Sequence, residues 1–309
     1  MCGIVGVADF AGRPISRTLL RQSATLVQHR GPDGQGVWEE RKGETNVAFG
    51  HQRLAVLDLS SCASQPMRNS GCVSQGTASP LVLVFNGEIY NFVEIRKKLE
   101  ADGAMFTTES DTEVLLSAWR EGGAGCLGAL DGMFAFALFD GELTNLVTDP
   151  FGEKPLYVVQ KDDGVYFASE PAPLIEMLGL TFDPTESELA AFLTLGFIPA
   201  PATGFKNLQL LQPGSHAVVA NGRITRITRY WTPDVPVVPG GKPAAVTESD
   251  IDDIAVAMIE SVRVRLRSDV PMVTFLSSGV DSALVAALAA KELSAIIPAI
   301  TVGFPGVGV

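Results

Sequence analysis

Cys2 stands directly after the first methionine, where its chemistry differs from that of a cysteine inside the chain. Removal of Met1 leaves a thiol and an α-amino group on one residue. The α-amine has a reference pKa of ~7.7–8.0, so near neutral pH it can accept the thiol proton, directly or through water. Taken alone, a cysteine at a chain end is more often a chance residue than a nucleophile. The motifs in the rest of the chain decide between these interpretations.

Short motifs follow one another along the chain, and the first of them contains Cys2. In chain order they are Met1-Cys2-Gly3-Ile4-Val5-Gly6, His29-Arg30-Gly31-Pro32-Asp33, His51-Gln52-Arg53-Leu54-Ala55-Val56-Leu57-Asp58, Asn86-Gly87-Glu88-Ile89-Tyr90-Asn91, Glu109-Ser110-Asp111-Thr112-Glu113, Gly132-Met133-Phe134-Ala135-Phe136 and Phe151-Gly152-Glu153-Lys154-Pro155-Leu156-Tyr157. This series resembles the class II glutamine amidotransferase domain of the glutamine-hydrolysing asparagine synthetases. The resemblance covers nearly all of the chain, and it implies an N-terminal-nucleophile α/β fold, a sandwich of sheets covered by helices (αββα).

The resemblance also implies a set of glutamine-hydrolysing residues with Cys2 as the nucleophile. Thiolate attack on the side-chain amide of glutamine creates an oxyanion, and aimed hydrogen-bond donors there are worth ~2.7–4 kcal/mol each. By resemblance, these donors are the Asn86 side chain and the backbone N–H of Gly87, where glycine lets the backbone approach the substrate. A guanidinium suits the α-carboxylate of glutamine and carboxylates suit its ammonium group. The resemblance assigns these roles to Arg53, and to Glu88 and Asp111.

Other motif residues are expected to support this site rather than to touch the substrate. Arg30 resembles the family arginine that holds the loop of the nucleophile. His29 is expected to be structural, because the α-amine can serve as the base. Glu109 stands where the family often has glycine; it adds negative charge near the ammonium site, and we expect its side chain to point away. Three further residues are expected to be scaffold: Asp33, Tyr90 and Asn91.

A second loop, of small residues, lies between an expected buried strand (residues 271–276) and an expected helix (283–291). Such a loop presents N–H groups and the positive end of a helix dipole to an anion, although an ordinary N-cap and tight turn show the same pattern. It resembles the Ser-Gly-Gly-x-Asp-Ser loop of ATP pyrophosphatases, which in the same family holds the pyrophosphate of ATP with Mg²⁺ while aspartate becomes β-aspartyl-AMP. The resemblance implies these ATP-binding residues: Leu276, Ser277, Ser278, Gly279, Asp281, Ser282 and Val302.

The second loop departs from the family pattern at Ser278, where glycine is usual. If that position needs a left-handed backbone, serine costs ~1–2 kcal/mol and its Cβ crowds the phosphates, so we expect weakened ATP binding. The family's later metal-binding and aspartate-binding segments are expected to lie past Val309, the last residue of the sequence. We therefore expect these 309 residues to support glutamine hydrolysis only.

Proline and glycine mark residues 232–243 as a linker, because that composition cannot continue a helix or a central strand. Before the linker, period-2 patterns predict strands at 47–49, 81–85, 134–139, 156–159, 165–168 and 216–219. In the same part of the chain, period-3.6 patterns predict helices at 19–28, 94–101, 112–121 and 186–195. After it, a helix (250–267), a strand (272–276), a helix (283–291) and a strand (296–302) predict the first βαβ unit of a doubly wound parallel sheet.

These patterns predict an amidotransferase domain at residues 2–217, a connecting segment at 218–246, and the N-terminal part of an asparagine synthetase domain at 247–309. Residues 61–80, rich in Ser, Gly and Gln, are expected to form a surface loop without chemistry. The unpaired edge of a two-stranded sheet favours association, so homo-oligomers are a further expectation.

The composition excludes several classes of function. A net charge of -12, from 23 Lys+Arg against 35 Asp+Glu, repels nucleic acid and anionic lipid. The apolar runs are shorter than the ~18 residues of a membrane span and no basic flank marks a signal peptide, so a soluble, cytoplasmic protein is expected. No cysteine or histidine spacing is typical of a disulfide framework or a metal site, and Cys62, Cys72 and Cys126 are expected to be ordinary thiols.

The leading interpretation is a glutamine-dependent asparagine synthetase, with glutamine, aspartate and ATP as its small-molecule partners. Ammonia released at Cys2 would amidate ATP-activated aspartate to give asparagine. Two alternatives stay open. A related amidotransferase could serve another acceptor, in surface polysaccharide or secondary metabolism, because the acceptor site lies in the segments expected to be missing. An inactive regulatory paralogue is the second, but a binding module has no use for the nucleophile Cys2.

Overall fold

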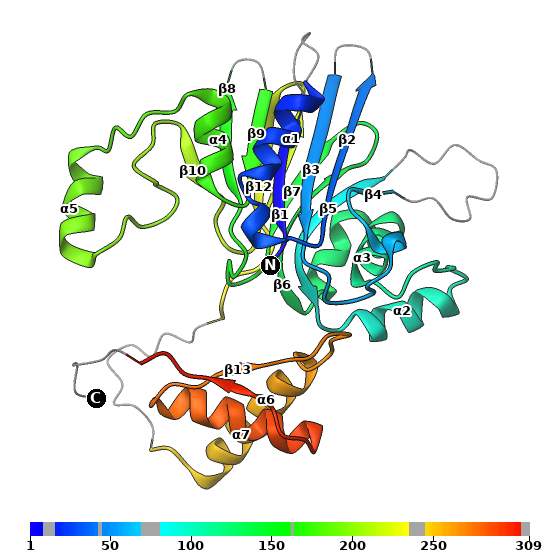
Figure 1. Ribbon diagram of the computed structural model, residues 1–309, viewed down its shortest axis with the longest axis vertical. Coiled ribbons are helices and arrows are strands. Elements are labelled where there is room, and N and C mark those ends of the chain that lie inside the picture. Colours follow the sequence, from blue (N-terminus) through cyan, green and yellow to red (C-terminus); the bar gives the residue numbers. More distant parts are fainter. Residues whose placement is uncertain (9–15, 43–44, 69–80, 162–163, 235–244, 304–309) are drawn as a thin grey trace. The chain divides into compact units, whose positions relative to one another are not determined.

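The computed structural model describes residues 1–8, 16–42, 45–68, 81–161, 164–234 and 245–303. The chain divides into two compact units, Met1–Pro233 and Asp234–Val309, and Figure 1 shows the elements of each. Cys72 and most of the expected loop 61–80 and linker 232–243 lie outside the described residues. No helix in the described ranges is both long enough and apolar enough to cross a membrane.

The first unit contains two six-stranded antiparallel sheets. In spatial order, the first sheet contains β10 (Leu208–Leu210), β8 (Tyr157–Lys161), β9 (Gly164–Ala168), β1 (Gly3–Ala8), β3 (Thr45–Arg53) and β2 (Gly34–Lys42). The second contains β12 (Arg223–Arg229), β11 (Ser215–Ala220), β7 (Thr144–Thr148), β6 (Gly132–Phe139), β5 (Val82–Ile89) and β4 (Met67–Arg68). The predicted strands before the linker are confirmed. β1, at the centre of its sheet, was not predicted.

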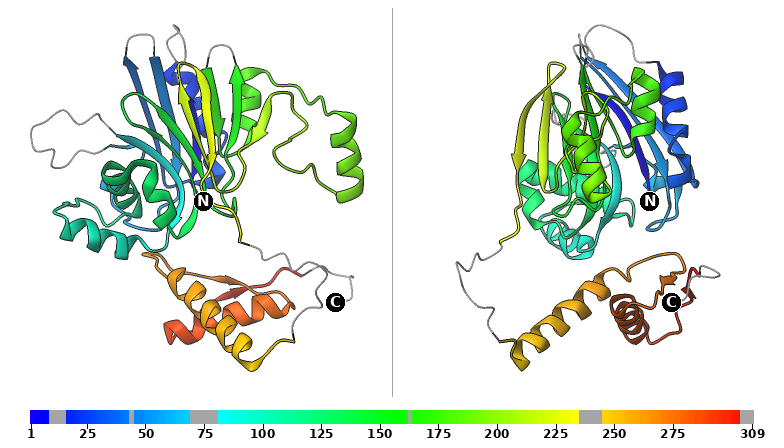
Figure 2. Two further views of the ribbon diagram at one scale, coloured as in Figure 1. Left: turned by 180° about the vertical axis from the view of Figure 1, so that it is seen from behind. Right: turned by 90° about the vertical axis from the view of Figure 1, so that its left-hand side faces the viewer.

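Helices cover the outer faces of the two sheets, as Figure 2 shows from the side. The helices of this unit are α1 (Arg17–Thr25), α2 (Phe92–Ala101), α3 (Asp111–Gly122), α4 (Pro171–Leu178) and α5 (Glu186–Leu195), with short 3₁₀ turns η1 (Gln28–Arg30), η2 (Ser61–Ala63) and η3 (Gly123–Ala129). α1 and α4 pack on the first sheet, and α3 packs on the second with α2 beside it. The expected sandwich of sheets covered by helices is therefore present.

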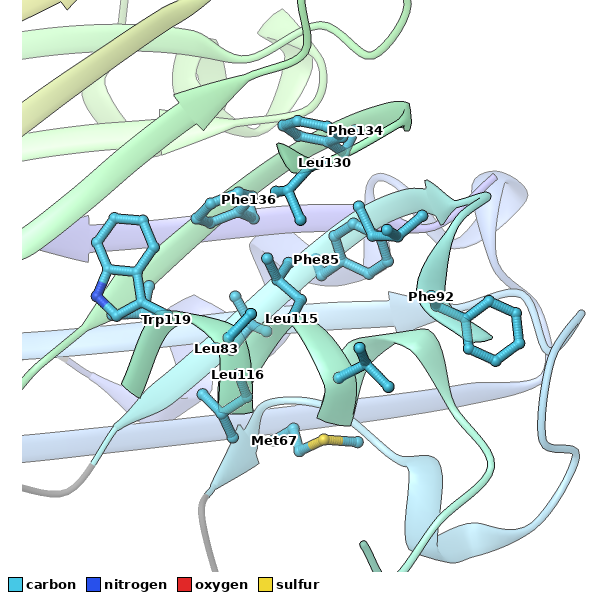
Figure 3. Packing of buried hydrophobic residues seen from close by; sticks show 14 of the residues in the cluster. Met67, Leu83, Phe85, Phe92, Leu115, Leu116, Trp119, Leu130, Phe134 and Phe136 are labelled. Carbon is cyan, nitrogen blue, oxygen red and sulfur yellow. The ribbon is translucent and has the colours of Figure 1, made fainter. Parts of the chain in front are cut away.

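Strand β6 is buried on both of its faces. Successive strand residues face opposite sides of a sheet, and all of residues 134–139 are buried. Phe134 and Phe136 face α3 in the cluster drawn in Figure 3, whereas Ala135 and Ala137 face the first sheet. These alanines share the cluster between the two sheets with large side chains such as Phe49 and Phe167, and this packing holds the ends of β1, β3 and β5 near one another.

Asp149, just after β7, organises the loop that follows it. Its buried carboxylate accepts backbone N–H bonds from Phe134 (3.1 Å), Phe151 (2.9 Å), Glu153 (3.0 Å) and Lys154 (3.0 Å). One side chain thus accepts hydrogen bonds that backbone carbonyl groups accept in regular structure, and these bonds fix the position of the Lys154 backbone.

Asp149→Ala is expected to lower the free energy of unfolding by about 2 kcal/mol, because it leaves several backbone donors without their acceptor. Asp149→Asn is the matched control, since it keeps one of the two oxygens, and it should lose less. Urea denaturation of both variants measures the difference. Equal losses for the two variants would contradict the assigned hydrogen-bonding role.

The first compact unit extends beyond the expected domain end at residue 217. That position lies inside β11, and β12 pairs with β11 from Ser215↔Arg229 to Ala220↔Arg223. The two strands complete the second sheet, so the unit ends at Pro233, at the start of the proline-rich segment. The amino-acid composition of such a hairpin does not distinguish it from a connecting segment.

The second unit contains the expected order of helix, strand, helix and strand. These are α6 (Glu248–Val264), β13 (Thr274–Phe275), α7 (Val280–Leu293) and β14 (Ala299–Ile300). β13 and β14 pair in parallel, with Phe275 opposite Ile300, so the βαβ arrangement is present. The prediction of a buried strand at 271–276 was wrong: β13 has two residues and Phe275 is 72% exposed. A two-stranded sheet offers it one neighbouring strand and little cover within the described part of this unit.

Candidate active site

A cavity of about 190 Å³ opens in the first unit at the ends of β3 and β5, next to the start of β1 and the N-terminus of α3. Its walls bring together six residues singled out in the sequence: Cys2, Arg53, Asn86, Gly87, Glu88 and Asp111. These residues come from four separate segments of the chain. The hydrophobic cluster of Figure 3 lies between β5 and α3, and it fixes these two elements, which supply four of the six residues.

Cys2 is half-buried at the start of β1, and its thiol lies against Leu54. The Leu54 N–H donates to Sγ (3.4 Å), and Arg30 Nε donates to the Cys2 carbonyl oxygen (2.9 Å). Burial raises the pKa of the Cys2 thiol, and the Asp111 charge adds to this effect. Burial also lowers the pKa of the neighbouring Met1 α-amine, as do the charges of Arg30 and Lys154. A lowered pKa favours an amine that accepts a proton, and removal of Met1 would give this role to the α-amine of Cys2 itself.

Asn86 lies on β5 and is fully buried. Neither its amide nitrogen nor its amide oxygen has a hydrogen-bond partner in the described part of the chain. Buried polar groups are nearly always paired, because an unpaired one costs about 1–3 kcal/mol. An unpaired amide in the wall of a cavity that also holds a thiol is therefore a site prepared for a polar ligand.

Gly87 follows Asn86, and the reason for glycine there is the neighbouring strand. A Cβ at Gly87 would overlap the carbonyl oxygen of Met133 on β6 and would come within 2.6 Å of the Phe134 Cα. The sequence suggested close approach of a substrate, whereas the structure shows close approach of β6. A side chain at this position would push β5 away from β6 and move Asn86 with it.

Asp111 is the first residue of α3, whose N-cap Ser110 accepts the Thr112 N–H. Its carboxylate is buried and accepts the Ile89 N–H at 3.0 Å. Burial raises the pKa of Asp111 to about 7; the Glu88 charge acts in the same direction, and the bond from Ile89 opposes it. A carboxyl group held in this way gains strongly from a cation placed beside it.

Arg53 ends β3 and is held by carbonyl oxygens of the following loop. Nη1 donates to Ser60 O (2.7 Å), and Nη2 donates to Leu57 O (3.4 Å) and to the carbonyl oxygen of Asp58. A guanidinium has five N–H donors, so donors remain for a carboxylate in the cavity. Arg53 and Asp111 thus place a cation and an anion in the wall of one small cavity.

Arg30, His29 and Glu109 lie outside the lining of this cavity. Arg30 links the Cys2 carbonyl to Glu170, with 2.8 Å between Nη1 and Oε1, while His29 is exposed and also contacts Glu170. Glu109 points outward as predicted: its side chain is 81% exposed and pairs with Arg96 at 2.7 Å. The remaining scaffold candidates join loops or are buried: Asp33 accepts from Ala55 N, Asn91 bonds Ala129 O and Asp131 N, and Tyr90 is buried.

Lys154 and Gln65 are among the residues of the cavity wall that had no role in the sequence analysis. Lys154 is 6% exposed, with Nζ 3.1 Å from Met1 Sδ, and burial lowers its pKa. Gln65 is buried and its Oε1 accepts the Phe85 N–H at 2.6 Å. The sequence feature that could have indicated Lys154 is its position in the last motif of the series. Gln65 fell in a segment expected to lack chemistry, and no local pattern marks it.

The expected ATP-binding residues lie together at one end of the second unit. Leu276 N donates to Ile300 O (2.9 Å), which joins the strands, and the loop that follows runs into α7 with Gly279 as N-cap. Ser277 and Ser282 hydroxyls are 2.8 Å apart and bind the loop backbone. The remaining residues, Ser278, Asp281 and Val302, are exposed.

Ser278 has no positive φ angle, so the left-handed strain considered for serine is absent at this position. The N-cap Gly279 also has an ordinary extended conformation, with φ -74° and ψ 148°. The expected cost of serine through backbone strain was therefore wrong. Crowding by its Cβ stays a prediction.

Two family models match the chain: "Glutamine amidotransferase domain" over residues 1–231 and "Asparagine synthase" over residues 253–307. Glutamine-hydrolysing asparagine synthetase 1 of Bacillus subtilis is 35% identical over 98% of this chain and 46% of its own length. A putative glutamine-hydrolysing asparagine synthetase of Mycobacterium tuberculosis is 34% identical over 98% and 48%. Amidase chry2 of Gibberella zeae is 28% identical over 93% and 42%.

The chain spans about half the length of the curated relatives it matches. Among solved structures, the glutamine phosphoribosylpyrophosphate amidotransferase of B. subtilis, complexed with ADP and GMP, matches with a TM-score of 0.56. The match covers 99% of this chain and 67% of that chain, at 18% sequence identity. This likeness shows the fold.

Proposed function

We propose that the first unit hydrolyses glutamine to glutamate and ammonia, because the chain belongs to the glutamine amidotransferase family, in the branch whose relatives are glutamine-hydrolysing asparagine synthetases. The observation that carries the proposal is the fully buried Asn86 amide, which has no partner in the described residues and lines one cavity with Cys2. An oxyanion formed at Cys2 would supply the missing acceptor.

In this proposal, glutamine is recognised by its two charged ends. Its α-carboxylate binds the Arg53 guanidinium, and its ammonium group lies beside Asp111 and Glu88 in the same cavity. The cation relieves the repulsion between the two carboxyl groups and favours the ionised form of Asp111. The side-chain amide of glutamine is then left to face Cys2 and Asn86.

The reaction begins with transfer of the Cys2 thiol proton to the α-amine of the same residue after Met1 is removed. The sulfur attacks the amide carbon, and the oxyanion accepts hydrogen bonds from Asn86 Nδ2 and the Gly87 N–H. Collapse of this intermediate breaks the C–N bond, and the ammonium group formed on Cys2 returns its proton to the departing ammonia. Water then hydrolyses the thioester and releases glutamate.

The second unit supports a proposal about where the ammonia goes. Its small-residue loop at the N-terminus of α7 fits a pyrophosphate group, which favours activation of an acceptor carboxylate by ATP. ATP with Mg²⁺ would provide the leaving group for that activation, and aspartate is the acceptor proposed here, because the relatives are named as asparagine synthetases. The rest of the acceptor site would lie in the part of the relatives that this chain does not span.

A different acceptor is the second candidate, favoured by the relative named amidase chry2. It would use the same cavity and the same Cys2 chemistry with another carboxylate at the second site. A regulatory paralogue without activity fits less well, because a module that only binds glutamine has no use for a cysteine nucleophile in the wall of the cavity.

Glutamate release from glutamine by untagged protein freed of Met1 tests the proposed hydrolysis. Pyrophosphate release with ATP and aspartate, measured in parallel, tests the synthetase step. Glutamate without pyrophosphate would support a glutaminase whose acceptor step is not completed by this chain. Absence of glutamate release would overturn the proposed function.

The pKa of Asp111, about 7 in the free cavity, predicts how glutamine binding depends on pH. Ammonium binding needs the ionised carboxylate, so protonation of Asp111 below pH 7 competes with glutamine. KM should rise about fivefold between pH 7 and pH 6, because the ionised fraction of a carboxyl group with a pKa of about 7 falls from about one half to about one eleventh over that range. Steady-state assays across pH 6–8 measure this dependence.

Asp111→Asn is the matched variant, since its amide oxygen can still accept the Ile89 N–H. It should show a KM raised by about one to two orders of magnitude, with a smaller loss in kcat, and no pH dependence of KM in this range. A variant whose KM still rises as pH falls would show that another group causes the effect.

A further inference from the structure

Asp58, five residues after Arg53, has an unusual backbone and two hydrogen bonds that reach in different directions. Its φ angle is 50°, in the left-handed region that residues other than glycine rarely adopt. Oδ1 accepts the Ser60 N–H (3.0 Å), and Oδ2 accepts the Glu109 N–H (2.8 Å). Partial burial favours the neutral acid, but these bonds and the Arg53 charge together lower the pKa of Asp58, so it is ionised at neutral pH.

These two bonds join the loop that holds Arg53 to the segment that leads into Asp111. On one side, the carbonyl oxygens of Leu57, Asp58 and Ser60 accept from the Arg53 guanidinium. On the other side, Glu109 stands two residues before Asp111, and the Glu109 side chain points away to Arg96. The Asp58 side chain is thus a direct link between the loop after β3 and the start of α3.

From this link we infer that Asp58 is a positioning residue that sets the spacing between Arg53 and Asp111, and so selects for a free α-amino acid. The inference rests on the proposed function, in which these residues bind the two charged ends of glutamine. A ligand that uses both charges gains from a fixed spacing, because its second contact then forms at no further cost of ordering. A ligand with one of the two charges gains much less.

Glutaramate, which is glutamine without the amino group, is the probe that separates these cases. It keeps the side-chain amide and the carboxylate, but it has no ammonium group for Asp111. The quantity to measure is the ratio of kcat/KM for glutamine to that for glutaramate, together with the dissociation constants of both by calorimetry.

Asp58→Gly isolates the side chain, because glycine accepts the left-handed backbone without strain and provides no acceptor. We expect KM for glutamine to rise about tenfold, the cost of about 1.4 kcal/mol, with kcat within about threefold of wild type and a preference over glutaramate that falls in parallel. Asp58→Asn, which tolerates the same backbone and retains one acceptor oxygen, should recover part of the preference.

Asn221→Gly is the matched control for the backbone change, since Asn221 has φ 51° in the turn between β11 and β12 and does not line the cavity. It should leave KM and the preference unchanged. Equal losses for glutamine and glutaramate in Asp58→Gly, or a loss in kcat alone, would overturn the inference. Wild-type protein that binds glutamine but releases no glutamate would overturn the proposed hydrolysis, while the dissociation constants would still decide the role of Asp58.

Discussion

Cys2→Ala is expected to abolish glutamate release, by at least about four orders of magnitude in kcat, because none of the other described residues in the cavity wall has a thiol that could form the thioester. The thiol lies beside Leu54 N at 3.4 Å, and the α-amine of the same residue, free once Met1 is removed, would serve as its base. Since burial raises the pKa of this thiol, free thiolate is scarce at neutral pH and the base is required.

The same loss is expected when the thiol is kept and the free amine is removed. An extension of a few residues ahead of Cys2 leaves the sulfur in place but turns its α-amine into a peptide N–H, which cannot accept a proton. Cys62→Ala is the matched control: Cys62 is an exposed free cysteine that does not line the cavity, and its variant should retain full activity. Activity that survives both changes at Cys2 would place the catalytic centre elsewhere.

Asn86→Ala is expected to lower kcat by about 10²–10³ with a smaller change in KM, the effect of removing one oxyanion donor. The reason is that Asn86 has no hydrogen bond to lose in the described ground state, so its donor acts when charge develops on the amide oxygen. Single-turnover measurement of thioester formation would report this step directly.

Stability separates this role from a structural one. Removing a buried amide that has no partner relieves a desolvation cost, although it leaves a small cavity, so Asn86→Ala should change the free energy of unfolding by less than about 1 kcal/mol. A large loss of stability would instead assign Asn86 to the scaffold. A variant with raised KM and unchanged kcat would assign it to ground-state binding.

The sequence by itself determined the candidate site residues and most of the local elements that hold them. Cys2, Arg53, Asn86, Gly87, Glu88 and Asp111 were identified from their motifs, and the structure places all six in one cavity wall. Helix α5 was predicted from its period-3.6 pattern with the bounds that it has, and in the structure its N-cap Thr185 and the following Gly196 mark both ends locally. Such signals depend on neighbours along the chain, and the chain itself provides them.

Only the tertiary structure decided the features that depend on residues far apart in the chain. The unpaired amide of Asn86 and the pKa of Asp111 follow from burial by other elements, and the link from Asp58 to Glu109 joins segments 51 residues apart. Lys154 enters the cavity because Asp149 bends its loop. Hydrogen bonding and desolvation depend on which residues are close in space. The composition and periodicity of the sequence therefore do not show which distant residues will be partners.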